Sequence, residues 1–94
     1  MNQSEVLAAI GRGEDGYSLL LERIPGAKRR FDRIVKQLSG FLADVRAEFP
    51  DAEFYTGGGG LNLLLGNSHD DNANPQQDLV ALVGKDITIG DGDW

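Results

Sequence analysis

Cysteine is missing from this sequence of 94 residues. Its absence excludes disulfide bonds, thiolate zinc sites and cysteine nucleophiles, and it fits a reducing compartment. The chain also lacks the basic segment and following apolar segment that a secretory signal needs. Its apolar runs extend over only a few residues, far short of the roughly 20 that span a membrane. We therefore expect a cytoplasmic protein that makes no contact with a membrane.

Aromatic residues are few, at 7% of the chain, and only one histidine is present. The remaining composition, with 40% apolar and 26% charged residues, is ordinary for a globular protein. Disorder of the whole chain is therefore not expected. At this length we expect one domain over residues 1–94, with enough buried surface for a single core.

Positive charge is scarce in the second half of the chain. Residues 1–47 hold eight basic and six acidic residues, 8 − 6 = +2, whereas residues 48–94 hold one basic and nine acidic residues, 1 − 9 = −8. Together these halves give the net charge of −6. Such polarity bears on partners and self-association rather than on the fold.

Three helices are predicted before Pro50. Residues 4–10 form a short helix capped by Ser4. A second helix starts at Asp15 or Tyr17, runs to Ile24 and ends at Pro25-Gly26. Apolar residues then recur at i, i+3, i+4 and i+7 for about five turns, which predicts a long amphipathic helix over residues 27–49. The residues expected to face the core are Val6, Leu7 and Ile10 in the first helix, Tyr17, Leu20, Leu21 and Ile24 in the second, and Phe31, Ile34, Val35, Leu38, Leu42, Val45 and Phe49 in the third, with Phe41 beside them.

Short apolar runs separated by polar and glycine-rich segments follow Pro50. Residues 52–56, 61–65, 79–83 and 87–89 predict three or four antiparallel strands, with a helix as the open alternative for the leucine-rich run 61–65. The run 79–83 is apolar throughout, so we expect a central strand buried on both faces. Two short helices and one long amphipathic helix packed on a 3–4 stranded antiparallel sheet define an α+β fold.

Four consecutive glycines, Gly57 to Gly60, follow the first predicted strand. A glycine loop can cradle phosphate, because its backbone N–H groups can approach the anion closely. The phosphate-loop motif also requires Gly-Lys-Ser/Thr at the start of a helix. Here Leu61-Asn62 follow the glycines, so the favoured interpretation is a hairpin turn.

A polar segment begins like a calcium-binding loop. Asp70, Asn72 and Asn74 would take the first three ligand positions. The sixth position should be glycine and is Pro75, and the twelfth should be glutamate and is Ala81. An exposed polar loop needs the same residue types, so no metal site is predicted.

Ser68, His69 and Asp70 are the residue types of a hydrolytic triad. Adjacent residues cannot easily adopt the triad geometry, which normally comes from separate segments. Asp91 and Asp93 could pair as carboxylates, but their position between glycines near the end of the chain favours solvation. No catalytic residue and no cofactor is therefore predicted.

Five basic residues at the start of the long helix form the candidate interaction surface. Cations at that end oppose the helix dipole at a cost of a few tenths of a kcal/mol each, so helix stability alone would not select them. They fit either a solvated face paired with the acidic second half or a docking surface for an acidic partner. This basic cluster consists of Lys28, Arg29, Arg30, Arg33 and Lys36.

Because no catalytic motif is complete, we expect a small non-enzymatic protein-interaction or regulatory module that binds a protein partner or itself. The alternative is a small nucleic-acid or nucleotide-binding protein that uses the basic cluster and the glycine loop. Nucleic acid is not favoured, because the pI of about 4.5 is acidic. Aromatic residues also do not interleave with the basic ones to form a stacking platform.

Overall fold

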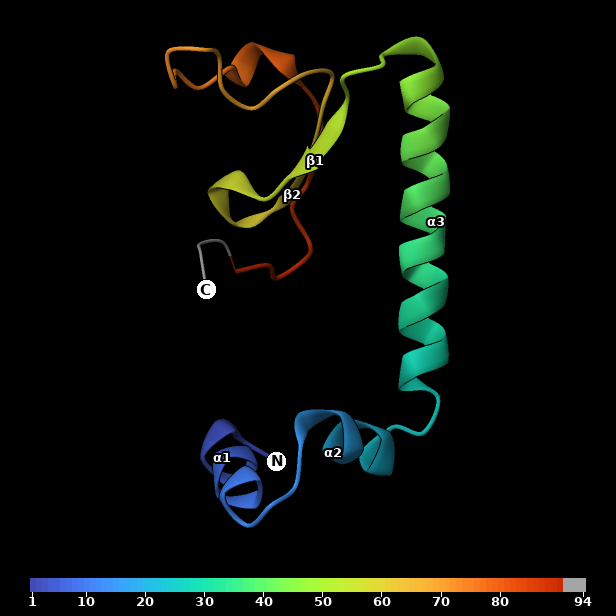
Figure 1. The fold of residues 1–94 in the computed structure, drawn as a ribbon, viewed down its shortest axis with the longest axis vertical. Helices are drawn as coiled ribbons and strands as arrows, with labels where there is room; N and C mark the ends of the chain where they lie inside the picture. The colour runs from blue at the N-terminus through green and yellow to red at the C-terminus, as the bar shows by residue number, and fades with distance from the viewer. Residues whose placement is uncertain (91–94) are drawn as a thin grey trace. The chain divides into compact units, whose positions relative to one another are not determined.

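The computed structural model describes residues 1–90, and it confirms the predicted α+β class with three strands in the sheet. The connections include two short 3₁₀ turns, η1 (Gly57–Gly59) and η2 (Gln77–Leu79). The main elements, which Figure 1 traces, are α1 (Gln3–Gly11), α2 (Gly16–Arg23), α3 (Ala27–Glu48), β1 (Glu53–Tyr55), β2 (Leu61–Leu64) and β3 (Val80–Gly84).

The chain divides into two compact units, Met1–Gln37 and Leu38–Trp94, and each is described by itself. The first unit contains α1, α2 and the first turns of α3. The second contains the rest of α3 and the whole sheet. The single domain expected over residues 1–94 stays a prediction.

Side-chain caps begin both short helices. At α1 the Asn2 side chain accepts a hydrogen bond from the Glu5 backbone N–H, and the Glu5 carboxylate accepts one from the Asn2 N–H. This reciprocal capping box places the cap at Asn2, so the prediction of Ser4 was wrong. At α2 the Asp15 carboxylate accepts a 2.7 Å bond from the Ser18 N–H, which lowers the pKa of Asp15.

Packing of α1 against α2 buries only two apolar side chains, Ala9 and Leu19. The predicted inward faces were therefore largely wrong. In α2, for example, Tyr17 and Leu20 are exposed. Three consecutive leucines cover most of the circumference of a two-turn helix, so periodicity alone cannot select its buried face.

The long helix α3 matches the predicted range to within one residue. Its C-terminal end is fixed to the start of the sheet by a 2.7 Å bond from Arg46 Nε to the Ala52 carbonyl oxygen. No residue of α3 is buried, however, and Phe31 is 67% exposed. The expectation that its apolar face belongs to the core is therefore not met by the described residues.

Gly40 lies within α3, and no packing contact among the described residues requires a glycine there. A Cβ added there meets nothing within 4 Å, and the backbone of Gly40 is helical. We expect Gly40→Ala to stabilise the protein by about 1 kcal/mol, the difference in helix propensity, which raises the melting temperature by roughly 4–8 °C. Thermal unfolding followed by circular dichroism at one fixed protein concentration measures this shift. An unchanged or lower melting temperature would show that glycine is required at this position.

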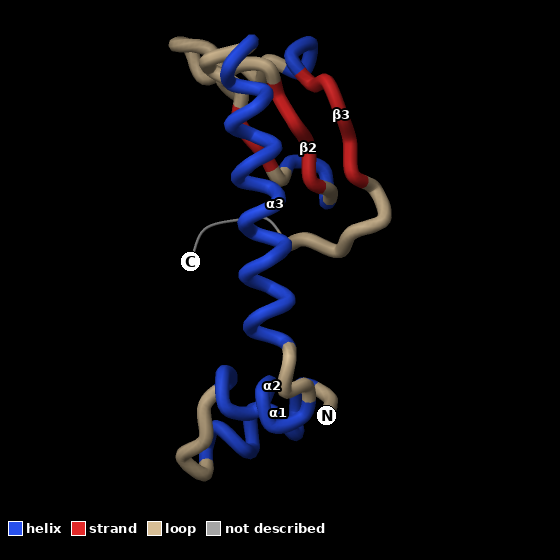
Figure 2. Tube along the Cα trace, turned by 90° about the vertical axis from the view of Figure 1, so that its right-hand side faces the viewer, coloured by secondary structure: helices blue, strands red, loops and turns tan. Residues whose placement is uncertain are grey.

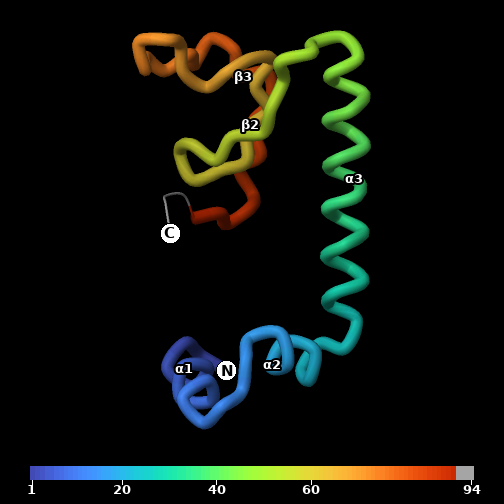
Figure 3. The backbone as a smooth tube through the Cα atoms, in the orientation of Figure 1, coloured from blue at the N-terminus to red at the C-terminus, as the bar shows by residue number. Residues whose placement is uncertain are grey.

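The sheet is an antiparallel meander with the order β1-β2-β3. Its central strand is β2, which settles the ambiguity of the leucine-rich run as a strand and buries Leu63 and Leu64. Figure 2 shows β2 and β3 side by side. Figure 3 shows the segment between them running away from the strands before it returns.

Two predictions about the end of the sheet were wrong. The strand β3 lies at the edge, and every residue in it is exposed, although an apolar run of this kind was expected at the centre. Residues 87–89 form no strand, which leaves three strands. In a meander the middle strand in chain order takes the centre, whatever the hydrophobicity of its neighbours. No helix among residues 1–90 combines the length and the apolar character needed to cross a membrane.

Candidate functional site

An apolar stripe runs along α3, and most of its side chains are exposed. Six of its residues are exposed, and the other two, Leu42 and Val45, are half-buried. Leu38, near the middle, is 36% exposed. The stripe, called the α3 stripe below, consists of Phe31, Ile34, Val35, Leu38, Phe41, Leu42, Val45 and Phe49.

The basic cluster lies on the first turns of α3, and all five of its residues are exposed. Lys28 is not free, because its Nζ lies 2.6 Å from Asp32 Oδ2 one turn further along. That hydrogen bond, together with the carboxylate charge, raises the pKa of Lys28. Among residues 1–90, Arg12–Glu14 is the only other ion pair. The remaining four cations of the cluster therefore have no carboxylate partner within the described part of the chain.

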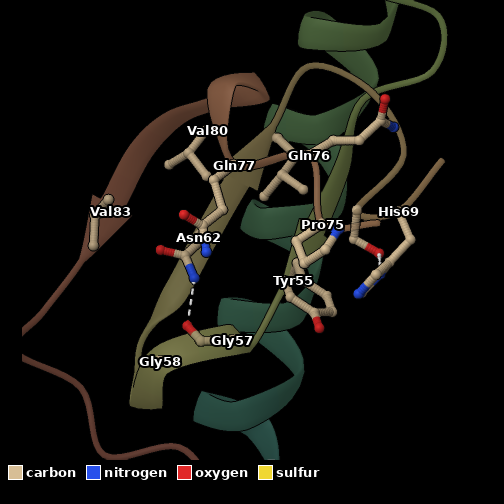
Figure 4. A pocket seen from close by; sticks show the side chains of 12 residues that line it. Tyr55, Gly57, Gly58, Asn62, His69, Pro75, Gln76, Gln77, Val80 and Val83 are labelled. Carbon is tan, nitrogen blue, oxygen red and sulfur yellow. Dashed lines mark hydrogen bonds between the residues drawn. The ribbon is translucent and has the colours of Figure 1, made fainter. Parts of the chain in front are cut away.

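A separate hollow of about 440 Å³ lies on the second unit, between the first strands and the loop before β3. Figure 4 shows Tyr55, Pro75, Gln76 and Gln77 around it, with Asn62 reaching toward the glycine turn. No lysine or arginine is among its lining residues. The hollow therefore offers a phosphate no lysine or arginine side chain.

The glycine loop forms the β1–β2 hairpin turn. Gly58 and Gly59 have φ angles of +74° and +78°, which side chains rarely allow. A Cβ on Gly60 would lie 2.6 Å from the Gly84 carbonyl oxygen on β3. The Asn62 amide donates a 2.7 Å bond to the Gly57 carbonyl oxygen and closes the turn. The predicted hairpin turn is confirmed, and steric reasons account for these glycines.

Ser68 and His69 lie next to the hollow with Ser68 Oγ 3.0 Å from His69 Nδ1. The Tyr55 ring meets His69 edge to face, with centroids 6.2 Å apart. A triad would need Asp70 to orient the imidazole, but Asp70 Oδ1 accepts bonds from the backbone N–H groups of Asn72 and Asn74. Asp70 therefore organises its own loop.

The two hydrogen bonds to Asp70 Oδ1 join the three residues of the calcium-like pattern, Asp70, Asn72 and Asn74. The bond from the Asn74 N–H, supported by the one from Asn72, holds the pKa of Asp70 below its ordinary value. Within residues 1–90 no three His, Cys, Asp or Glu side chains gather to hold a metal ion. Asp91 and Asp93 lie outside the described residues.

Sequence reasoning missed two parts of these surfaces. It assigned the α3 stripe to the core, because periodicity reveals an apolar face but not what covers it. It did not select Tyr55 or Gln76, which line the hollow from distant segments. No local pattern joins those two residues, so only the fold could bring them together.

Comparison with known protein families, with curated proteins and with solved structures finds no match to this chain.

Proposed function

We propose that this protein is a non-enzymatic protein-interaction module that binds its partner through the α3 stripe. The observation that carries the proposal is the exposure of six of the eight stripe residues on a helix without a buried residue. Exposed apolar patches of several hundred Å² are typical of interaction sites. An amphipathic helix that offers its apolar face to a partner is a recurrent mode of protein recognition.

The small size of the internal core supports the same proposal. Within the described residues, only Ala9, Leu19, Ala52, Leu63 and Leu64 are buried apolar residues. The large side chains of the stripe contribute little to that core, although they are the chain's most regular apolar pattern. A partner that covers them would supply the burial that the chain itself does not.

The basic cluster meets this surface at one edge. Of its four unpaired cations, Arg30 borders the stripe and favours an acidic group on the partner. The other three lie 140° or more around the helix from Leu38. The nucleotide-binding alternative receives less support. The glycines are needed for the turn, and the hollow beside them has no lysine or arginine in its lining.

Site-specific photo-crosslinking tests the proposal. A benzophenone amino acid at position 38, on the stripe, should form a discrete protein adduct in the native cells. The same group at position 43 should not, because Ala43 lies about 140° around the helix from Leu38. The adduct at position 38 should also disappear when Phe41→Asp is added. Equal labelling at both positions, or none at position 38, would count against an interface on the stripe.

A further inference from the structure

We propose that the partner of the α3 stripe is the stripe of a second copy of this chain, with the two α3 helices antiparallel. This inference rests on the proposed function and names its partner. An isologous pair of this kind uses one surface twice, related by a two-fold axis.

The shape of the stripe fits a helix pair. At about 100° per residue, its eight side chains fall within roughly 120° of the circumference of α3. That width is typical of a helix that buries one face against a neighbour. The spacing also continues over about five turns, as in helices that pair along their length.

Charges border the stripe on both edges. Arg30 and Glu48 are 18 residues apart, which is about five full turns, so they lie on the same edge. Lys28 and Arg46 are also 18 residues apart and share the other edge, where Lys28 is paired with Asp32. The first edge therefore carries one cation and one carboxylate, at opposite ends of the helix.

The pair on the first edge sets a register for two copies. Arg30 and Glu48 lie nine residues before and nine after Ser39. In an antiparallel two-fold pair each edge faces the same edge of the second copy. A register centred on residue 39 therefore sets Arg30 opposite Glu48 of the second copy, twice in each dimer. This charge complementarity is what favours a second copy as the partner.

The opposite orientation is disfavoured by the basic cluster. A parallel pair would bring the two clusters together at the same end, where like charges repel. The antiparallel pair separates them and places each beside residues 38–48 of the other copy. Those residues have a net negative charge, because they hold two carboxylates, Asp44 and Glu48, and one cation, Arg46. One helix face on each copy makes a small interface, so we expect association in the micromolar range.

Charge exchange between residues 30 and 48 tests the pairing. Neither side chain makes an ion pair or a side-chain hydrogen bond within the described residues, so the exchange disturbs no internal contact. Arg30→Glu and Glu48→Arg should each weaken self-association about tenfold, because two attractive pairs per dimer become repulsive. The double variant should restore it to within about threefold of the original chain. A mixture of the two single variants should dimerise more tightly than either alone, as sedimentation and native mass spectrometry can measure.

The natural absence of cysteine permits a second test that does not depend on charge. Only residues near the midpoint of an antiparallel pair face themselves, so Leu38→Cys should form a disulfide-linked dimer under mild oxidation. Phe31→Cys should not, since its counterpart would lie about 24 Å away along the axis. In a parallel pair both variants would crosslink. Crosslinking of both, of neither, or of position 31 alone overturns the antiparallel arrangement.

Failure of this inference is distinguishable from failure of the proposed function. If the chain stays monomeric up to about 100 µM but forms the position 38 adduct with another protein, the proposed self-association is wrong. The proposed interaction module then still stands. A monomer without that adduct loses both. A double charge variant that is no tighter than the single ones also overturns the proposed register.

Discussion

Leu38→Asp should weaken self-association by roughly a thousandfold. The site lies at the centre of the α3 stripe, next to the midpoint of the proposed pair, and each dimer would contain the substitution twice. Losing apolar burial and desolvating a carboxylate costs about 2 kcal/mol per site, or about 4 kcal/mol per dimer. A free energy of that size raises the dissociation constant roughly a thousandfold. Analytical ultracentrifugation over a wide concentration range measures it.

The matched control is Ala43→Asp, which adds the same charge to the opposite side of the same helix. Association should then stay within about twofold of the original. Helix content, followed by circular dichroism, should be retained by both variants, because Leu38 and Ala43 are exposed in the single chain. Equal weakening by the two substitutions would mean that net charge, and not the stripe, controls association.

Thermal stability should depend on protein concentration. The single chain buries few apolar side chains, so much of the stability should come from the contact between copies. A hundredfold rise in concentration favours a folded dimer by about 2.7 kcal/mol. For a pair of chains of this length, this shift raises the melting temperature by roughly 5–10 °C.

Scanning calorimetry at about 5 µM and about 500 µM can measure this increase. The dependence should largely disappear in Leu38→Asp, which should also melt at a lower temperature than the original chain. The Ala43→Asp control should keep the dependence. A melting temperature that stays constant across this range would show that the chain's own contacts supply its stability.

The elements of this fold were easier to predict than their burial. The period of Phe31, Leu38 and Val45 located α3 to within one residue, and the leucine-rich run gave β2. Periodicity records that a face is apolar, but it does not say whether that face meets the same chain or another one. The wrong assignment of the α3 stripe to the core follows directly from that limit.

Local chemistry explains other differences. Asn2 and Ser4 are both good caps, and the reciprocal bonds with Glu5 select Asn2. The apolar run at β3 resembled a central strand, yet chain order placed β2 between its neighbours. The sequence alone identified the basic cluster. The structure adds that one of its five cations, Lys28, is paired with Asp32. Its role as a binding surface stays a prediction.

The edge position of β3 has a consequence for colloidal behaviour. Its residues Val80–Gly84 carry no charge, and one side of the strand has no neighbour among the described residues. Uncharged, exposed edges can template strand-by-strand growth into insoluble aggregates. At neutral pH the net charge of −6 keeps molecules apart, but this repulsion vanishes near pH 4.5. Acidification thus removes the main barrier to such growth, and Lys85, directly after β3, is the nearest residue that can still interrupt it.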